Sequence, residues 1–288
     1  MSWEYEGLFD AELNDEPRLW RTEPVEGTVG RMQYRTKTIK AGPRLEVEIY
    51  PVWPREIQRK ARAARKNITP IRMAEINRRN AEDYLVQLAD ANFSDEDIHL
   101  TLTYAGSAPS FEQMQKDVRN FFGRLKRFRK RNGMPELKYI YSIEDEEDGE
   151  KKRIHSHMLL SGPGGKMDLN RYRAEVERIW SKGYANADRL QPNENGLEQI
   201  TRYLTKQQRN RRRWCPSKNL KKPRVRVSNT KVSNARVKKI ARTWENEAKE
   251  ILEKIYPEYT LAPDRARAYT SDLLPGVYIR AVMRRRGG

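Results

Sequence analysis

Residues 153–160 read RIHSHMLL and place two of the chain's three histidines, His155 and His157, inside an apolar segment. Such a run predicts a β-strand, in which alternate side chains share a face, so the two imidazoles point the same way about 7 Å apart. Two imidazoles on one face of an apolar strand indicate a shared task, and binding a divalent metal is the most direct one. A pair of half-exposed histidines on a solvated face is the alternative, which this motif alone leaves open.

The preceding segment, KYIYSIE at residues 138–144, also predicts a strand and ends in Glu144. Antiparallel pairing of the two strands would place Glu144 beside His155 and His157. Two imidazoles and one carboxylate, with open coordination positions, suit Mg²⁺ or Mn²⁺ that must also hold a phosphate oxygen. The acidic residues 145–148 that follow predict a solvated loop, although any of them could compete as a ligand.

The segments around these two strands alternate between strand and helix patterns. A strand is predicted at 98–104, a helix opened by Ser110 and stopped by Gly133, a helix at 168–182, a short strand at 185–190 and a helix at 197–208. Apolar residues recur at helical spacing in the first helix, which predicts a core face. Its basic residues are expected on the outer faces; they are Arg124, Lys126, Arg127, Arg129, Lys130 and Arg131. This order predicts an α+β fold with a central antiparallel sheet flanked by helices.

The flanking regions predict basic extensions of that core. A hairpin is expected at 36–50, a helical region at 54–92 with a break at Pro70, a last helix at 234–255, and then an irregular tail. The predicted division is 1–96 for the N-terminal hairpin and basic helical region, 97–210 for the core, and 211–288 for a basic C-terminal DNA-binding extension. Whether residues 1–50 and 234–288 extend the core sheet or form a separate module stays open at this stage.

Composition narrows the class of protein and its partner. The 288 residues carry 58 Lys and Arg against 40 Asp and Glu, a formal charge of +18, and 26 aromatic residues (6 Trp, 14 Tyr, 6 Phe). Such aromatic content excludes a mostly disordered chain, and the charge favours a polyanionic partner, most simply nucleic acid. One cysteine excludes a disulfide framework and a thiolate zinc cluster. The acidic start and the absence of a long apolar run indicate neither a secretory signal nor a membrane span, so a cytoplasmic location is expected.

The segment GLEQITRYLTKQ, residues 196–207, places Tyr203, Lys206 and Gln207 on one helix face. A helical tyrosine is usually a packing residue. After a metal-binding strand in a basic protein, however, its oxygen could attack a metal-polarised phosphodiester and form a covalent ester. Lys206 could neutralise or position the phosphate.

Three motifs together resemble HUH-type single-strand endonucleases of the rolling-circle replication initiator (Rep) kind. His99–Tyr104 (HLTLTY) resembles the first motif, Ile154–Leu160 (IHSHMLL) the metal-binding motif, and Tyr203–Lys206 (YLTK) the nucleophile motif. In many members of this family a carboxylate residue precedes the two histidines, and the resemblance assigns that position to Glu144. Residues 214–223 and 36–50 are similar to the phage and bacterial-element branch related to filamentous-phage gene 2-type proteins. His99 is not assigned to the metal set, because a hydrogen-bonded strand-end histidine is an equally good interpretation.

The resemblance implies a replication-associated protein, a metal-dependent endonuclease that nicks a single-stranded DNA origin, with a stem-loop as one form of that origin. Tyr203 would form a 5′-phosphotyrosyl intermediate and free a 3′-OH for rolling-circle replication, with religation by reversal. Host helicase and polymerase are the implied partners, in the bacterial cytoplasm if a phage or plasmid encodes the chain. A transposase of the same superfamily and a non-catalytic origin-binding repressor are the alternatives. Gln207 at the second tyrosine position indicates a one-tyrosine enzyme, and the tyrosine's place after the histidines disfavours a relaxase.

The tract from Arg209 to Arg242 holds 14 Lys or Arg residues and no acidic residue, which favours phosphate contacts. Trp214 follows three arginines and could stack on an unpaired base. The predicted DNA-binding residues are Arg209, Arg211, Arg212, Arg213, Trp214, Lys218, Lys221 and Lys222.

Overall fold

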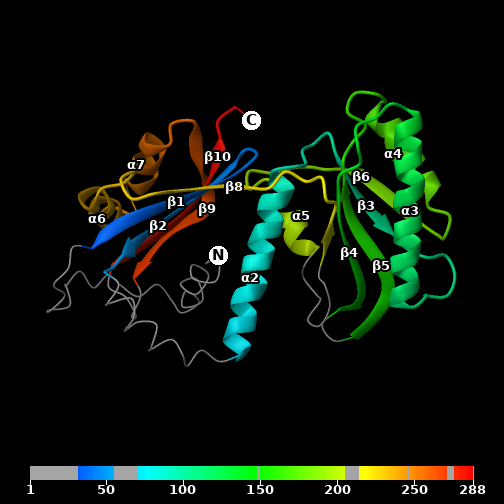
Figure 1. Cartoon of the computed structure of the whole chain (residues 1–288), viewed down its shortest axis with the longest axis horizontal. Helices are drawn as coiled ribbons and strands as arrows, with labels where there is room; N and C mark the ends of the chain where they lie inside the picture. The colour runs from blue at the N-terminus through cyan, green and yellow to red at the C-terminus, as the bar shows by residue number, and fades with distance from the viewer. Residues whose placement is uncertain are drawn as a thin grey trace. The chain divides into compact units, whose positions relative to one another are not determined.

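The computed structural model describes residues 32–54, 70–147, 150–204, 214–245, 247–270 and 276–287 (Figure 1). The chain divides into two compact units. Unit 1 combines Met1–Gln87 with Pro223–Gly288, and unit 2 is Leu88–Lys222. Each unit contains a five-stranded antiparallel sheet with helices, which confirms the predicted α+β class. The N-terminal and C-terminal regions thus share one unit, a pairing that the sequence left open.

The sheet of unit 2 has the strand order β6-β3-β5-β4-β7. Its bounds are β3 Ile98–Leu102, β4 Tyr139–Glu147, β5 Glu150–Leu160, β6 Ala185–Arg189 and β7 Cys215–Pro216. Strands β3 and β6 fall where the alternating patterns predict them. Strands β4 and β5 are longer than predicted, so the solvated loop predicted at 145–148 is wrong for residues 145–147, which belong to β4 because their backbone continues the pairing with β5. The short edge strand β7 was not predicted; it pairs Cys215 with Tyr141 of β4 and brings the start of the basic C-terminal tract to this sheet.

Helices α3 (Phe111–Arg131) and α4 (Leu169–Ile179) cover one face of this sheet (Figure 1). Helix α3 begins at its Ser110 cap, whose hydroxyl accepts a hydrogen bond from the Gln113 N–H, and Gly133 follows with φ +61°. Core residues of α3 pack against those of β5 that alternate with the histidines; they are Met114, Val118, Phe121 and Leu125 of α3 and Ile154, Met158 and Leu160 of β5. The histidine face is therefore the one that α3 and α4 leave uncovered.

One basic residue of α3 contradicts its predicted outer position. Arg129 is only 2% exposed, and its guanidinium donates to the backbone carbonyls of Pro135, Ser161 and Gly162. Buried carbonyls without N–H partners need donors, and a planar guanidinium can satisfy several at once. Arg129 therefore serves the core, while its neighbours in the sequence stay at the surface.

The sheet of unit 1 has the strand order β8-β1-β2-β10-β9. Its strands are β1 Gln33–Ala41, β2 Arg44–Val52, β8 Arg224–Ser228, β9 Tyr259–Thr270 and β10 Val277–Arg285. The predicted hairpin is confirmed, turning at Gly42 with φ +57°. The predicted irregular tail is wrong, because β10 pairs with both β9 and β2 inside the sheet.

Two short helices replace the single helix predicted over 234–255: α6 is Asn234–Arg242 and α7 is Ala248–Ile255. Their apolar sides pack on one face of the unit 1 sheet, with Val237 and Leu252 fully buried in the same cluster as Val47.

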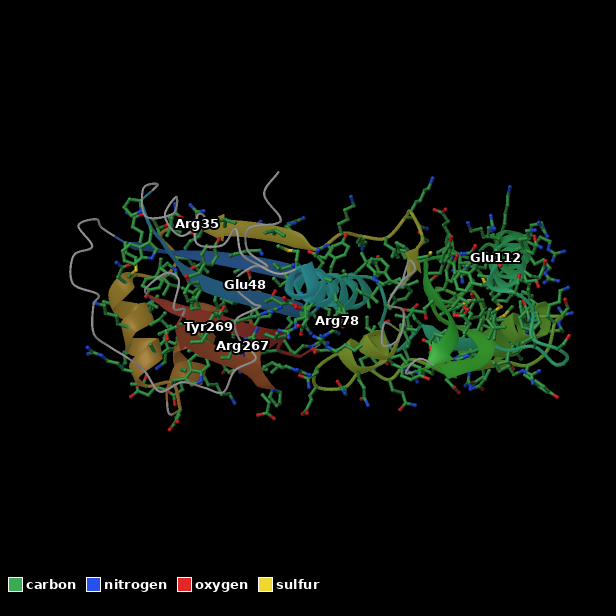
Figure 2. All side chains as sticks on the ribbon, turned by 90° about the horizontal axis from the view of Figure 1, so that it is seen from below. Arg35, Glu48, Arg78, Glu112, Arg267 and Tyr269 are labelled. Carbon is green, nitrogen blue, oxygen red and sulfur yellow. The ribbon has the colours of Figure 1, made fainter. Side chains whose placement is uncertain are left out.

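On strand β9 of the same sheet, the Arg267 guanidinium lies 5.8 Å from the centroid of the Tyr269 ring; both residues are labelled in Figure 2. No helix in the described part of the chain has the length and apolarity needed to span a membrane.

Helix α2 (Pro70–Asp90) begins at the predicted break, and its Gln87 contributes to a buried network in unit 1. Glu46 of β2 is 0% exposed and lies 2.7 Å from Arg44 Nε, 3.0 Å from Gln87 Nε2 and 3.7 Å from Arg280 Nη2. Arg280 also donates to Asp83 Oδ2 at 2.7 Å. Within this network, each Glu46 oxygen has a partner.

Candidate metal centre and nucleophile

Glu144, His155 and His157 lie together on the uncovered face of the unit 2 sheet. The ligand atoms that they offer all lie within 4.8 Å of one another, and His155 Nε2 is 3.4 Å from Glu144 Oε2. This grouping follows from the register, because β4 and β5 pair Glu144 directly with His155 and Ser142 with His157. The antiparallel pairing predicted from the sequence therefore has the expected geometric result.

A change of register follows the carboxylate. The pairing of β4 with β5 shifts between Glu144 and Glu146, so the regular ladder ends at the Glu144–His155 pair and resumes at the Glu146–Lys151 pair. Such irregularities occur often beside active sites, where they re-aim a side chain or end the pairing.

Hydrogen bonds on the far side of each ring orient the two imidazoles. His155 Nδ1 is 2.9 Å from the carbonyl oxygen of Arg153, and His157 Nδ1 is 3.1 Å from Thr101 Oγ1. A carbonyl only accepts, so Nδ1 of His155 carries a proton, and the ring turns its Nε2 towards Glu144. Outer partners of this kind fix tautomer and ring orientation at metal sites. Sequence reasoning missed Thr101, which lies directly opposite His157 on β3.

The donor atoms fit a metal ion. Glu144 Oε1 and His157 Nε2 are buried, and neither has a hydrogen-bond partner within the described residues. Burying such atoms without a partner costs free energy, which a bound cation would offset. Burial, helped by the neighbouring rings of His155 and His99, lowers the pKa of His157 to about 3, so its imidazole is neutral and able to donate a lone pair.

His99 belongs to the site without joining the metal group. Its ring stacks on that of His157 with centroids 5.4 Å apart and planes 12° apart, and its Nε2 is buried with no partner among the described residues. Burial lowers the pKa of His99, while Asp188 acts in the opposite direction. The alternation HLTLT places His99 on this face, but the sequence could not predict that it stacks on His157.

Tyr203 is the last residue of helix α5 (Glu198–Tyr203) and faces the imidazoles. Its ring centroid is 5.0 Å from that of His157 in an edge-on arrangement, and the residue is 47% exposed. The helix is anchored at its start, where the Leu197 N–H donates to Asp90 Oδ1 at 3.0 Å, and by buried Thr201. The structure thus brings Tyr203 beside the metal group, whereas Lys206 and Gln207 lie outside the described residues.

A pocket of about 350 Å³ adjoins the tyrosine. His99 and Tyr203 form part of its wall, and the remaining lining comes from β6, from the loop after it and from α5. The lining residues are His99, Asp188, Arg189, Leu190, Gln191, Asn193, Gly196, Gln199, Ile200 and Tyr203. The candidate nucleophile therefore sits at an accessible concavity with several polar groups.

The predicted DNA-binding residues are only partly described. Arg209, Arg211, Arg212 and Arg213 lie outside the described residues. Trp214 is half-buried just before β7, whereas the side chains of Lys218, Lys221 and Lys222 are at least partly exposed. The backbone of Lys221 is held by the side chain of Asn92 through two hydrogen bonds of 2.8 Å, which fixes where this tract leaves unit 2.

Comparison with known proteins identifies the segment that carries this site. The model of a family of replication-associated proteins, described as ORF2 and gene 2 protein, matches residues 97–208, which include Glu144, His155, His157 and Tyr203. No curated protein and no solved structure matches the chain. The match confirms the resemblance to gene 2-type replication initiators over this segment, and it supports a role in the initiation of DNA replication. Residues 97–208 are thus similar to the replication-associated ORF2 and gene 2 protein family.

Proposed function

We propose that this protein is a metal-dependent, single-strand-specific DNA endonuclease that nicks a replication origin through Tyr203 and so starts rolling-circle replication. One observation carries the proposal. Two buried atoms of the group, Glu144 Oε1 and His157 Nε2, have no hydrogen-bond partner among the described residues, and an exposed tyrosine ring lies 5.0 Å from the His157 ring. Polar residues that only stabilise the fold normally pair all of their buried oxygen and nitrogen atoms. A protein that only binds DNA does not need a tyrosine placed beside a metal-binding group.

Glu144, His155 and His157 would hold Mg²⁺ or Mn²⁺. When bound, the ion polarises a non-bridging oxygen of the scissile phosphate. Arg153 and Thr101 keep the two imidazoles oriented, so the donor atoms need not rearrange when the substrate arrives.

Tyr203 would supply the nucleophile. Its phenolic oxygen forms a bond to phosphorus and loses its proton, while the bond from phosphorus to the 3′-oxygen breaks and that oxygen leaves as a 3′-OH. The downstream segment stays attached through its 5′ phosphate, as a phosphotyrosyl ester. Reversal, with a 3′-OH attacking that ester, would rejoin a strand and release the tyrosine.

The positively charged residues that follow Tyr203 in the sequence and the implied host proteins complete the proposal. Lys206 would neutralise the phosphate, and the basic tract from Arg209 to Lys222 with Trp214 would hold the single strand. A host helicase and polymerase would open the duplex and extend the free 3′-OH, and the reaction would take place in a bacterial host's cytoplasm.

The test is a gel assay for protein–DNA adducts that survive SDS. Purified protein is mixed with labelled single-stranded DNA from its own genetic element, with Mn²⁺ or with EDTA. We expect a metal-dependent adduct in the wild type and a loss of at least about 10³-fold in Tyr203→Phe, because the nucleophile is missing. Tyr184→Phe is the matched control, since Tyr184 is also an exposed tyrosine of unit 2, and its adduct should equal that of the wild type.

Two results would overturn the proposal. An adduct that persists in Tyr203→Phe would assign the nucleophile to another residue. Binding of every strand of the element without any adduct would favour a non-catalytic origin-binding protein.

A further inference from the structure

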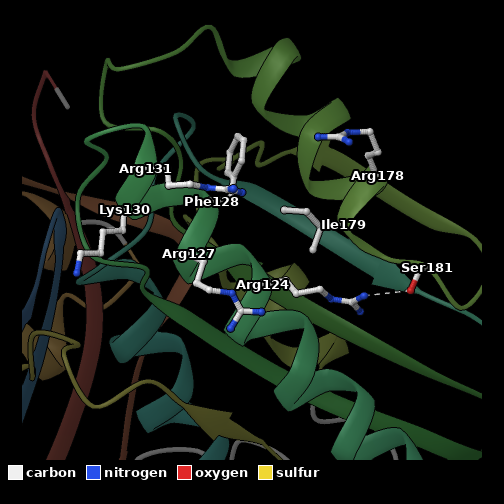
Figure 3. A pocket seen from close by; sticks show the side chains of 8 residues that line it. All are labelled: Arg124, Arg127, Phe128, Lys130, Arg131, Arg178, Ile179 and Ser181. Carbon is white, nitrogen blue, oxygen red and sulfur yellow. Dashed lines mark hydrogen bonds between the residues drawn. The ribbon is translucent and has the colours of Figure 1, made fainter.

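A second cationic site lies on the helical side of unit 2. Helices α3 and α4 form the walls of a pocket of about 760 Å³ (Figure 3). Its lining residues are Arg124, Arg127, Phe128, Lys130, Arg131, Arg178, Ile179 and Ser181. Five of these eight residues carry a positive charge, and no acidic residue is among those described as lining it.

This pocket is separate from the metal group. The opposite side of α3 packs against Ile154 and Met158 of β5, whereas His155 and His157 point to the other face of the same strand. The sheet therefore lies between the pocket and Tyr203, and one extended strand at the tyrosine would not reach both by a direct path.

The charges in the pocket are poorly compensated by the protein. Arg178 pairs with Glu175 at 2.6 Å, and Arg124 donates to Ser181 Oγ at 3.1 Å, the contact drawn in Figure 3. The Nε of Arg124 is buried without a partner, and neither Arg127 nor Arg131 forms an ion pair within the described residues. Like charges gathered in one concavity repel one another, and a polyanion would relieve that repulsion.

The arrangement of the cations indicates the ligand. Arg124, Arg127 and Arg131 follow helical spacing along one face of α3, and seven residues of helix rise about 10 Å. That length is close to the width of the DNA major groove, about 12 Å, so the two ends of the row could reach phosphates on opposite sides of a groove. Phe128 is the one aromatic residue among the described lining residues and is partly buried against the core, which favours phosphates over unpaired bases as the ligand.

We propose that this pocket binds the phosphodiester backbone of a base-paired DNA segment, apart from the single strand at Tyr203. The contacts are to phosphates and read no base sequence. Such a site would let unit 2 hold duplex DNA next to an origin while the opposite face of its sheet engages the unpaired strand.

The test measures binding of a labelled 20-base-pair duplex and of a 20-nucleotide single strand by fluorescence anisotropy across a salt series. EDTA is present throughout, so that neither metal nor nicking is involved and the result is independent of the role of Tyr203. The pocket variant is Arg127→Gln with Arg131→Gln. Its control is Lys116→Gln with Arg171→Gln, which removes the same charge from exposed positions of the same two helices outside the pocket.

We expect the pocket variant to bind the duplex about tenfold more weakly, with the slope of log K against log[salt] reduced by about 2, since each phosphate contact contributes about 1. The control and the single-strand affinity should stay near wild type. If thermal melting shows that the double variant is destabilised, Arg131→Gln alone carries the same test, with a slope change of about 1.

Three results would overturn the inference. If the pocket variant binds the duplex as tightly as the wild type, the pocket is not a duplex-binding site. Equal losses in the pocket variant and its control would show a diffuse effect of net charge. A loss of single-strand affinity as large as the duplex loss would place the unpaired strand in this pocket instead.

Discussion

Glu46 of unit 1 and Glu144 of unit 2 are both buried glutamates on strands of five-stranded antiparallel sheets, at 0% and 7% exposure. Arg44, Gln87 and Arg280 surround Glu46 and satisfy both of its carboxylate oxygens. Glu144 has one histidine contact at 3.4 Å, and its other oxygen has no partner within the described residues. A buried glutamate thus completes an ion-pair network in the unit 1 sheet. In the unit 2 sheet, a similarly buried glutamate keeps one carboxylate oxygen that could bind a metal ion.

This difference separates a structural cluster from a candidate site. In a fully paired buried network, removing one charge leaves the others uncompensated, so each member is needed by its partners. A buried oxygen without a partner has no such structural use, and a ligand that completes it is the simplest explanation. Three predictions test this distinction.

The largest expected effect is on the stability of the folded protein. Glu46→Gln leaves the guanidinium groups of Arg44 and Arg280 without their shared carboxylate, and we expect the free energy of unfolding to fall by about 3–5 kcal/mol. Glu144→Gln should change it by less than about 1 kcal/mol when measured in EDTA, because the contact of its carboxylate among the described residues is a long one to His155 at 3.4 Å. Urea unfolding followed by circular dichroism gives both values.

Glu75→Gln is the control for this experiment, since Glu75 is an exposed glutamate of helix α2 in an i,i+4 ion pair with Arg79 at 2.6 Å. Its cost should stay below about 1 kcal/mol. The comparison fails if Glu46→Gln and Glu144→Gln destabilise the protein equally.

A middle-sized effect is expected at the metal group. Thr101→Val removes the hydroxyl that contacts His157 Nδ1, so the ring loses its orienting partner. We expect Mn²⁺ to bind 10- to 100-fold more weakly, or about 1.4–2.7 kcal/mol, with the fold unchanged. Thr103→Val is the matched control, because its hydroxyl bonds to the Tyr184 carbonyl at 3.3 Å. Similar affinities in the two variants would show that Thr101 does not position the imidazole.

The smallest effect concerns a closed network in unit 1. Burial opposes ionisation of Glu253, but hydrogen bonds from the Leu261 N–H and the Thr260 hydroxyl, together with Arg286, hold its pKa below the ordinary value. A carboxyl whose pKa is lower in the folded state contributes stability that is present above the unfolded value of about 4.3 and is lost as pH falls through the folded value.

Glu253→Gln should therefore cost less than about 1 kcal/mol at pH 7, and this cost should vanish at acidic pH, where the wild type has also lost the charge. Melting temperatures of both proteins from pH 7 down to pH 3 provide the measurement. A gap between them that stays constant at every pH would show that the charge of Glu253 contributes nothing.

Local patterns in the sequence were sufficient to predict that Glu144, His155 and His157 lie together. The alternation in RIHSHMLL puts both histidines on one face, and the acidic loop between two strands predicts the hairpin that pairs Glu144 with His155. The orienting role of Thr101 could not be predicted, because it depends on the register between β3 and β5, which lie far apart in the sequence.

The failures have similar physical causes. Arg129 was predicted to lie at the surface because arginine is charged. Its guanidinium is instead buried, where it donates hydrogen bonds to backbone carbonyls of distant loops. The C-terminal tail was predicted to be irregular, yet β10 forms a strand between β9 and β2, and β2 lies more than 200 residues earlier in the sequence. Non-local pairing of this kind decides strand formation without leaving a local signal.

The central claim is that Glu144, His155 and His157 form a metal site, and titration of the protein with Mn²⁺ in a calorimeter tests it most directly. We predict one ion bound per chain in the wild type and in Glu75→Gln, with affinity at least about 100-fold weaker in Glu144→Gln and His157→Gln, each of which loses a ligand. Wild-type protein that binds no Mn²⁺ at millimolar concentration, or variants that bind it as tightly as the wild type, would contradict the account.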